Sequence, residues 1–279
     1  VTKDAKQIDG PLTLWQKDDK VWLELAPEDF GRLFILSPKL DTGIGEAFVR
    51  VLLESGAQRV YAGSRDPAAA AHLVEKYPGR CVALELDVTD FDEVARAARD
   101  CGDVSLVVNN AGLFSNQTLL GAPDMSIARQ EMEVNYFGTL AMCRAFAPVL
   151  ARNGGGGIIN VLSAAALCPI PNMGGYGPSK AAARSLSGCV RAELAGQGTQ
   201  VTALIVGSVD TRMAAHVEGG KEKPDDIARA GLRAVTRGID ELDTDRMAVE
   251  VRAALALDPK GLERRMARML NVPVIRTGR

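Results

Sequence analysis

The chain has 279 residues, of which 47% are hydrophobic, so it can bury a full core and we expect a soluble globular protein. Lys and Arg number 33 against 35 Asp and Glu, and this balance excludes a general electrostatic attraction to nucleic acid or to anionic membranes. The five cysteines form no C-x-x-C pair and the two histidines are too few for a histidine-based site, so neither a disulfide framework nor a metal site is expected.

Residues 1–40 carry the pattern of antiparallel strands. In LTLWQKDDKVWLEL, apolar and polar residues alternate on both sides of Lys17-Asp18-Asp19-Lys20, which predicts a short β-hairpin. We expect this hairpin to be a separate N-terminal segment, followed by an α/β domain over residues 41–279. Leu33 to Leu36 is apolar enough to supply the first strand of that domain.

From about residue 44, segments with helical periodicity alternate with short apolar runs. This alternation predicts an α/β fold with a doubly wound parallel sheet and helices on both faces. The expected strands are Arg59 to Ala62, Cys81 to Leu86, Val104 to Val108, Gly157 to Leu162 and Gln200 to Val206. The expected helices are 44–55, 67–77, 90–99, 124–152 and 176–196, with further helices opening near Pro224 and covering Thr244 to Leu257 and Pro259 to Leu270.

Tyr176 and Lys180 lie four residues apart on an expected helix, so both side chains project from one face. The nearby ammonium should lower the pKa of the phenol from its usual value of about 10. A phenol with such a pKa can give or take a proton near neutral pH. A Tyr and a Lys at this spacing also occur by chance on solvated helix faces, so the interpretation depends on the surrounding residues.

Other polar residues stand where this pair would need them. Ser163 follows the apolar run from Gly157 to Leu162, and a loop can bring its hydroxyl beside the phenol to hold a substrate carbonyl. Asn109-Asn110-Ala111-Gly112 follows the run from Val104 to Val108, at the carboxyl end of a strand, where ligands bind in open parallel sheets. Asn135 interrupts an apolar helix, which indicates a functional or buried hydrogen-bonding role.

The ordered set of NNAG at 109–112, VNxxG at 134–138, Ser163 and Tyr176-x-x-x-Lys180 resembles the short-chain dehydrogenase/reductase family over about residues 43 to 270. The resemblance implies a Rossmann-type fold and a nicotinamide-dependent carbonyl/alcohol oxidoreductase. Tyr176 would then be the general acid/base, and Lys180 would hold the nicotinamide ribose and lower the tyrosine pKa. Ser163 would orient the carbonyl and Asn135 would complete a proton relay. The residues that would line the cofactor are Asn109, Ala111 and Gly112, with Asp87 and Val88 flanking its adenine.

The residues after the strand Arg59 to Ala62 bear on the choice of cofactor. An acidic residue there would bind the ribose 2′-hydroxyl of NAD, whereas this chain has Gly63-Ser64-Arg65. The hydroxyl of Ser64 and the guanidinium of Arg65 suit a 2′-phosphate, so NADP(H) is expected over NAD(H). The alternative is that Arg65 only solvates a loop.

The phosphate-binding loop departs from the family pattern. Gly43, Ile44 and Gly45 match the last part of the usual T-G-x-x-x-G-x-G loop, whose glycines let backbone amides approach a pyrophosphate at a helix N-terminus. Lys39 stands at the first glycine position and Pro38 at the preceding threonine position. Proline removes an amide donor and lysine adds a Cβ, so both changes work against phosphate binding unless the Lys39 ammonium contacts phosphate itself.

A milder departure follows the strand Gln200 to Val206. Gly207 lacks the proline that usually precedes it in the family, which affects rigidity more than chemistry. Val209 and Thr211 still match the stretch that contacts the nicotinamide amide in the family. The resemblance therefore implies that Gly207, Val209 and Thr211 also bind the cofactor.

The block from Val1 to about Leu40 instead resembles the start of a bacterial zinc metallopeptidase family. It contains no H-E-x-x-H pair, so no peptidase activity is implied. A junction near Asp41 to Gly45 between two unrelated coding segments would account for this block and for the altered glycine loop.

The sequence leaves two functions open. The first is an NADP(H)-dependent reductase or alcohol dehydrogenase acting on a small or medium apolar carbonyl or alcohol, since the loop after Thr211 is rich in Met, Ala and Val. The second is a non-catalytic binding or regulatory protein, in which the altered loop at Pro38 and Lys39 no longer holds a dinucleotide. The resemblance implies a homodimer or homotetramer, and the lack of an apolar span or signal-peptide core predicts a cytoplasmic protein.

Overall fold

The computed structural model describes residues 43–211 and 221–270 with their side chains, and residues 6–8, 13–17, 20–24 and 33–37 by their backbone. The altered positions Pro38 and Lys39 lie outside the described residues, as does the segment 212–220 that follows Thr211.

A seven-stranded sheet forms the centre of the protein, with the strand order β10-β9-β8-β7-β4-β5-β6 and every neighbouring pair parallel. β4 lies between β5 and β7, so the direction in which the chain adds strands reverses at this point. Open parallel sheets bind ligands beyond the carboxyl ends of the strands at such a reversal. The strands are β4 (Leu33–Ser37), β5 (Arg59–Ser64), β6 (Cys81–Glu85), β7 (Val104–Asn109), β8 (Gly156–Val161), β9 (Thr199–Ile205) and β10 (Glu241–Asp243).

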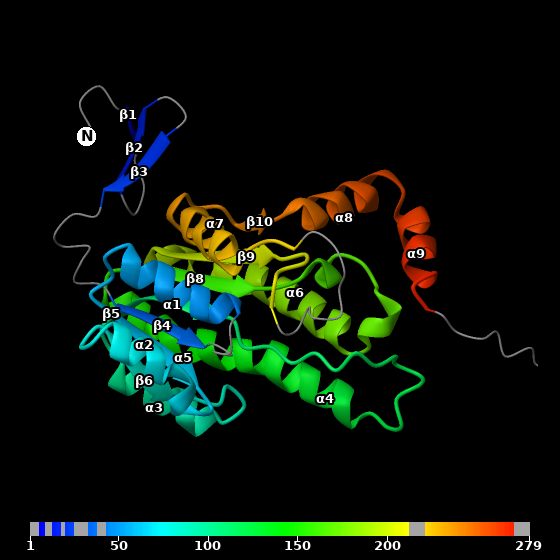
Figure 1. The fold of residues 1–279 in the computed structure, drawn as a ribbon, viewed down its shortest axis with the longest axis horizontal. Coiled ribbons are helices and arrows are strands. Elements are labelled where there is room, and N and C mark those ends of the chain that lie inside the picture. The colour runs from blue at the N-terminus through cyan, green and yellow to red at the C-terminus, as the bar shows by residue number, and fades with distance from the viewer. Residues whose placement is uncertain are drawn as a thin grey trace, which may run out of the picture.

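Helices cover both faces of the sheet, which confirms the expected doubly wound fold (Figure 1). Because side chains alternate along a strand, Val60 packs in the core on one face and its neighbour Tyr61 in the core on the other. The first face is covered by α1 (Ile44–Glu54), η2 (Pro67–Ala70), α2 (Ala71–Lys76) and α7 (Pro224–Thr236). The second face is covered by α3 (Phe91–Asp100), α5 (Thr139–Arg152) and α6 (Tyr176–Leu194).

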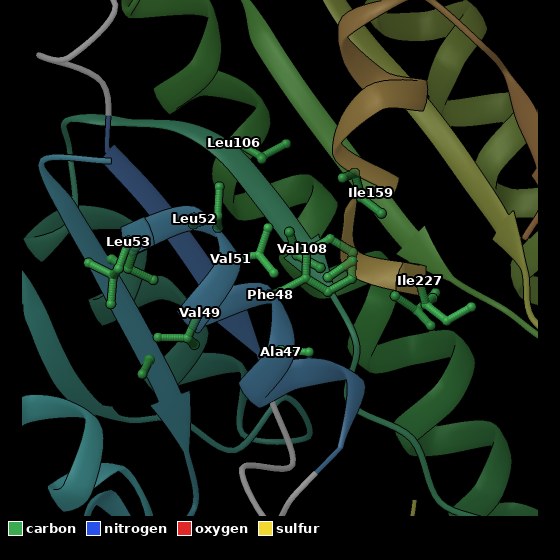
Figure 2. Packing of buried hydrophobic residues seen from close by; sticks show 14 of the residues in the cluster. Ala47, Phe48, Val49, Val51, Leu52, Leu53, Leu106, Val108, Ile159 and Ile227 are labelled. Carbon is green, nitrogen blue, oxygen red and sulfur yellow. The ribbon is translucent and has the colours of Figure 1, made fainter. Parts of the chain in front are cut away.

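Phe48 of α1 anchors the first face. Its side chain is fully buried and lies close to Val108 of β7 and Ile227 of α7 (Figure 2). α7 can approach because it carries Gly231 at the contact: a Cβ there would lie 2.9 Å from Phe48 Cζ and 2.6 Å from Leu204 Cδ1. This packing fixes α1, and with it the helix N-terminus that follows Gly43.

The expected helix 124–152 is interrupted. It consists of α4 (Ser126–Met132), a π-helical turn η3 (Glu133–Gly138) and α5, and Asn135 lies inside the π-helical turn. Such turns are rare and are found mostly at functional sites. The pattern of apolar residues did not predict this interruption, because the segments on both sides of the turn are themselves α-helical.

The C-terminal part packs beyond the carboxyl edge of the sheet. Cysteine, alanine and leucine side chains after β8 form a third core with α6, α8 (Arg246–Leu257) and α9 (Pro259–Ala267). The remaining short helices are η4 (Ala164–Ala166), η5 (Pro171–Met173) and η6 (Ala195–Gln197). Of the helices that the structure describes, none has the length and apolar character needed to cross a membrane.

The N-terminal strands confirm the expected hairpin. β2 (Thr13–Lys17) and β3 (Lys20–Glu24) pair antiparallel with Lys17 opposite Lys20, and β1 (Lys6–Ile8) adds a third strand that the pattern did not predict. β4 also falls within residues 1–40 but belongs to the large sheet, as its apolar sequence allowed. The division into segments 1–40 and 41–279 stays a prediction.

Candidate active site

Ser163 and Tyr176 meet beyond the carboxyl end of β8. Ser163 is the N-cap of η4 and accepts a hydrogen bond from the backbone N–H of Ala165, while Tyr176 begins α6 after Gly175. The Ser163 hydroxyl lies close enough to the phenol of Tyr176 to influence its ionisation. The edge of the Phe114 ring packs on Tyr176 at a centroid distance of 5.2 Å, and the phenol is buried.

Lys180 lies one helical turn further along α6 and is also buried. Its Nζ donates a hydrogen bond to the carbonyl oxygen of Val161 at 2.9 Å and lies 5.8 Å from the centre of the Tyr176 ring. Gly112 faces it closely, because a Cβ at Gly112 would lie 3.5 Å from Nζ and 3.4 Å from Asn135 Oδ1. Gly112, Asn135 and Lys180 therefore lie close together in the structure, although they are far apart in the sequence.

The expected effect of Lys180 on the phenol is wrong in this structure. Burial raises the pKa of Tyr176 to about 12, and the Glu131 carboxylate also raises it, while the nearby Ser163 hydroxyl acts in the opposite direction. Burial lowers the pKa of Lys180 to about 8. The spacing of the pair showed that the two groups are neighbours, but it did not show that both would lose their contact with water.

Asn135 fixes the loop after β7 to α6. Its Oδ1 accepts a hydrogen bond from the N–H of Leu113 at 2.8 Å, and its Nδ2 donates to the carbonyl oxygen of Leu113 at 3.0 Å and to Ser179 Oγ at 2.8 Å. Ser179 in turn donates to the carbonyl oxygen of Tyr176 at 2.7 Å. Ser179 could not be predicted from the sequence, since nothing in its neighbourhood sets it apart from an ordinary helix residue.

Asn109 is the last residue of β7, and only one of its two polar side-chain atoms has a hydrogen-bond partner among the described residues. Its Nδ2 donates to Asn160 Oδ1 at 2.8 Å, and Asn160 Nδ2 donates to Ser187 Oγ at 2.9 Å. Asn109 Oδ1 is buried and has no hydrogen-bond partner among the described residues, and the same holds for Ser208 Oγ after β9. Asn160 was missed, although a polar residue inside the apolar run Gly157 to Leu162 could have indicated it.

Val88 explains the glycine of the VNxxG motif. A Cβ at Gly138 would lie 2.6 Å from Val88 Cγ2, so this helix can approach the end of β6 only with a glycine. Val88, Asn109 and Ala111 line one small pocket together with residues of η3 and α5. Asp87 lies beside them and is held in a turn by hydrogen bonds from Thr89 N–H and Oγ1 at 2.9 and 2.7 Å.

The expected phosphate-binding groups lie at the ends of β4 and β5. Gly43 is the N-cap of α1, Ile44 and Gly45 lie in its first turn, and no side chain that the structure describes accepts a hydrogen bond from the first amides of this helix. Ser64 Oγ accepts a hydrogen bond from Asp66 N–H at 3.3 Å. The Arg65 side chain is exposed and forms no ion pair with any residue whose side chain the structure describes.

The loop after β9 is tied to α8. The N–H of Gly207 donates to Asp245 Oδ2 at 2.6 Å, while Asp245 Oδ1 caps α8 at Ala248 N–H. Val209 is buried and forms a β-bridge with Glu222, and Thr211 Oγ1 donates to the carbonyl oxygen of Val209 at 3.4 Å. Asp245 was missed because its partner is distant in the sequence.

A parallel sheet with this strand order, and with Ser163, Tyr176 and Lys180 gathered beyond its carboxyl edge, defines a Rossmann-fold oxidoreductase class. The chain belongs to the short-chain dehydrogenase family: the family model described as short chain dehydrogenase matches residues 40–222. Members of this family are oxidoreductases that use nicotinamide cofactors.

Individual relatives agree with the family. The chain is 41% identical to a short chain dehydrogenase from Burkholderia cenocepacia solved in complex with NADP, with a TM-score of 0.77 over 85% of this chain and 97% of that one. It is 27% identical over 228 residues to dehydrogenase/reductase SDR family member 7B of Xenopus laevis, covering 72% of this chain and 70% of the relative. It is 32% identical over 217 residues to probable oxidoreductase EphD of Mycobacterium tuberculosis, covering 73% of this chain but only 36% of that longer protein.

The comparisons give no support to the expected resemblance of residues 1–40 to a zinc metallopeptidase. The family match begins at residue 40, and the similar proteins are dehydrogenases, reductases and other oxidoreductases. Within residues 43–211 and 221–270, no group of three or more His, Cys, Asp and Glu side chains could hold a metal ion. The alternating pattern of that block reflects a β-hairpin, which many unrelated proteins contain.

Proposed function

We propose that this protein is an NADP(H)-dependent oxidoreductase that interconverts a carbonyl compound and a secondary alcohol, with Tyr176 as general acid/base. The observation that carries the proposal is the gathering of three groups: the Ser163 hydroxyl lies beside the buried phenol of Tyr176, and the buried Lys180 lies one turn away on the same helix. A hydroxyl pair of this kind can bind one carbonyl oxygen from two sides, which positions it for proton transfer.

A nicotinamide dinucleotide fits the residues beyond the strand ends. The buried oxygens Asn109 Oδ1 and Ser208 Oγ lack partners among the described residues, and polar ligand groups would satisfy them. Lys180 Nζ has one acceptor, Val161, and can donate further hydrogen bonds to ribose hydroxyls beside Gly112. When bound, the nicotinamide would supply or accept the hydride at its C4 atom.

The chain's own residues would then handle the proton. In carbonyl reduction, Ser163 would hold the substrate oxygen and Tyr176 would give it a proton; in alcohol oxidation, Tyr176 would take that proton back. Asn135 would keep Leu113 and Ser179 in place around the path by which the phenol is reprotonated. Burial of Tyr176 favours its neutral form, which suits the direction of carbonyl reduction.

Arg65 supports NADP(H) over NAD(H). Its exposed guanidinium has no carboxylate partner within the described side chains, so it is available to a 2′-phosphate at the end of β5. The Burkholderia cenocepacia relative was solved with NADP, which agrees with this preference. We also propose an apolar carbonyl substrate of small or medium size, a homo-oligomeric assembly and a cytoplasmic location, as expected from the sequence.

Titration with NADPH, followed by calorimetry, tests this proposal. The chain as written and a variant with Pro38→Thr and Lys39→Gly are compared, because these two positions distinguish the enzyme from a binding protein that has lost its dinucleotide. Binding by both chains supports the proposal, whereas binding by the restored variant alone overturns it for the chain as written. A Tyr176→Phe variant should bind NADPH as before and lose turnover by about 100-fold or more, and retained turnover would remove Tyr176 from its role.

A further inference from the structure

Glu131 is a buried carboxylate that the proposed reaction does not use. It lies near the end of α4, one turn before Asn135, and its side chain has no exposure to solvent. Its Oε1 accepts two hydrogen bonds from Ser115, one from the backbone N–H at 2.9 Å and one from Oγ at 2.8 Å. A carboxyl group that is fully buried needs polar partners to offset the loss of its hydration.

The second oxygen of Glu131 lies against the beginning of α6. Oε2 is buried without a hydrogen-bond partner among the described residues, and a Cβ at Gly175 would lie 2.7 Å from it and 2.8 Å from Ala128 Cα. Gly175 is the N-cap of α6, directly before Tyr176, and none of the described side chains caps this helix. A helix N-terminus carries partial positive charge, and Oε2 lies against the one that begins α6.

The groups that face Tyr176 come from four parts of the chain. Lys180 lies on the same helix, Ser163 follows β8, Phe114 packs on the ring from the loop after β7, and Glu131 approaches from α4. Glu131 is the one among them whose negative charge opposes ionisation of the phenol. Phe114 is also the neighbour of Ser115, which Glu131 holds.

We propose that Glu131 is a positioning residue that keeps Tyr176 protonated until a substrate oxygen takes the proton, and that it holds the Phe114–Ser115 loop against the phenol. The proposal builds on the proposed function, because it assigns a second carboxyl group to the acid/base behaviour of the same site. Its chemical basis is electrostatic: a phenolate beside a buried carboxylate would place two like charges close together inside the protein.

Glu131→Gln tests this role, because glutamine keeps the size of the side chain and an acceptor for Ser115 N–H but removes the charge. Ionisation of Tyr176 is followed by ultraviolet absorption after rapid pH jumps, with Tyr176→Phe variants of each chain subtracted to remove the other tyrosines. We expect the midpoint of Tyr176 to move down by about one pH unit in Glu131→Gln. Coincident midpoints for the wild type and Glu131→Gln would overturn the proposal.

Two matched variants separate the charge from the packing. Ser115→Ala removes a hydrogen bond to Glu131 but leaves its charge, and Glu131→Asp keeps a carboxylate, so both should retain a midpoint close to that of the wild type. A shift in Ser115→Ala as large as that in Glu131→Gln would overturn the electrostatic role. Glu131→Asp also keeps the test open if Glu131→Gln does not fold, since it should then fold and titrate as the wild type does.

The kinetic arm uses the pH profile of kcat/KM for alcohol oxidation. Its limb assigned to Tyr176 should move to lower pH in Glu131→Gln by the same interval as the absorption midpoint. The absorption measurement needs neither cofactor nor turnover. The role of Glu131 and the proposed oxidoreductase function can therefore be disproved independently of each other. A shifted midpoint in a chain without activity would keep Glu131 in its role and remove the proposed function, whereas activity with an unshifted midpoint would do the reverse.

Discussion

Lys180 Nζ donates a hydrogen bond to the carbonyl oxygen of Val161 at 2.9 Å, so the last residue of β8 fixes the ammonium. Val161 and Lys180 belong to a strand and a helix that are both held in the core, and the lysine side chain is almost fully buried. The ammonium is thus held in place by the fold itself, at the cost of its hydration. That cost has a measurable consequence for stability.

The free energy of unfolding should rise with pH between about 8 and 10 because of Lys180. Burial lowers its pKa from 10.5 to about 8, so within this window the unfolded chain holds a proton that the folded chain has released. Stability rises wherever the unfolded state binds more protons, here by about 1 kcal/mol per pH unit. Chemical denaturation at a series of pH values, compared between the wild type and Lys180→Met, isolates this slope.

The comparison with Lys180→Met is needed because other buried groups change their protonation in an overlapping pH range. Burial raises the pKa of Cys81 to about 11 and that of Cys101 to about 12, and these thiols weaken the folded state as pH rises above about 9. Both chains contain them, so their effect cancels in the difference. Parallel profiles for the two chains would show that the folded state leaves Lys180 with an ordinary pKa.

Gly138→Ala should destabilise the protein by about 1–3 kcal/mol, because its Cβ would lie 2.6 Å from Val88 Cγ2 and 3.3 Å from the carbonyl oxygen of Val88. Val88→Ala removes the first contact and should recover part of that loss in the double variant. Gly188→Ala on α6 is the matched control, since nothing lies within 4 Å of its added Cβ. It should stabilise the protein by about 0.5–1 kcal/mol. Thermal unfolding of the four variants checks the series, and additive effects of Gly138→Ala and Val88→Ala would contradict the packing argument.

Most of the sheet could be predicted from the sequence. A parallel strand buried on both faces is a short apolar run between helices, and β5 to β9 each form at such a run. β10 was not predicted because Glu241–Asp243 is short and polar. It lies at the edge of the sheet, where it pairs with one neighbouring strand only, β9. An edge strand of this kind forms because the backbone N–H and C=O groups of β9 can pair with it. The local sequence of β10 carries no sign of that pairing.

The site was predictable in its members but not in its electrostatics. Ser163, Tyr176 and Lys180 could be found because family motifs fix their order, and the fold then brings them together. The direction of the tyrosine pKa could not be found, because it depends on burial and on Glu131, which comes from another helix. Contacts between distant elements decide such quantities, and a spacing along one helix carries no information on them.

Asn135→Leu should destabilise the protein by about 2–3 kcal/mol, because the N–H and carbonyl of Leu113 would lose the bonds that Asn135 makes to them, and the Ser179 hydroxyl would lose the hydrogen bond that it accepts. Urea denaturation measures the change. Asn116→Gly is the control on the same loop: Asn116 is exposed and has a φ of 53°, which glycine adopts readily. Its stability should stay within about 0.5 kcal/mol of the wild type. Equal losses in both variants would mean that loop composition, rather than the Asn135 hydrogen bonds, limits stability.

Arg65→Ala should weaken NADPH binding by about tenfold or more and leave NADH binding unchanged. A hydrogen bond between a guanidinium and a phosphate is worth about 1.5–3 kcal/mol, and only NADPH carries the 2′-phosphate that Arg65 would contact. Arg246→Ala is the matched control, since Arg246 is an exposed arginine on α8 whose partner is Glu250. It should leave both affinities as they are. Calorimetric titrations with the two cofactors give the ratio directly, and an equal loss of NADPH and NADH affinity in Arg65→Ala would show that Arg65 does not distinguish them.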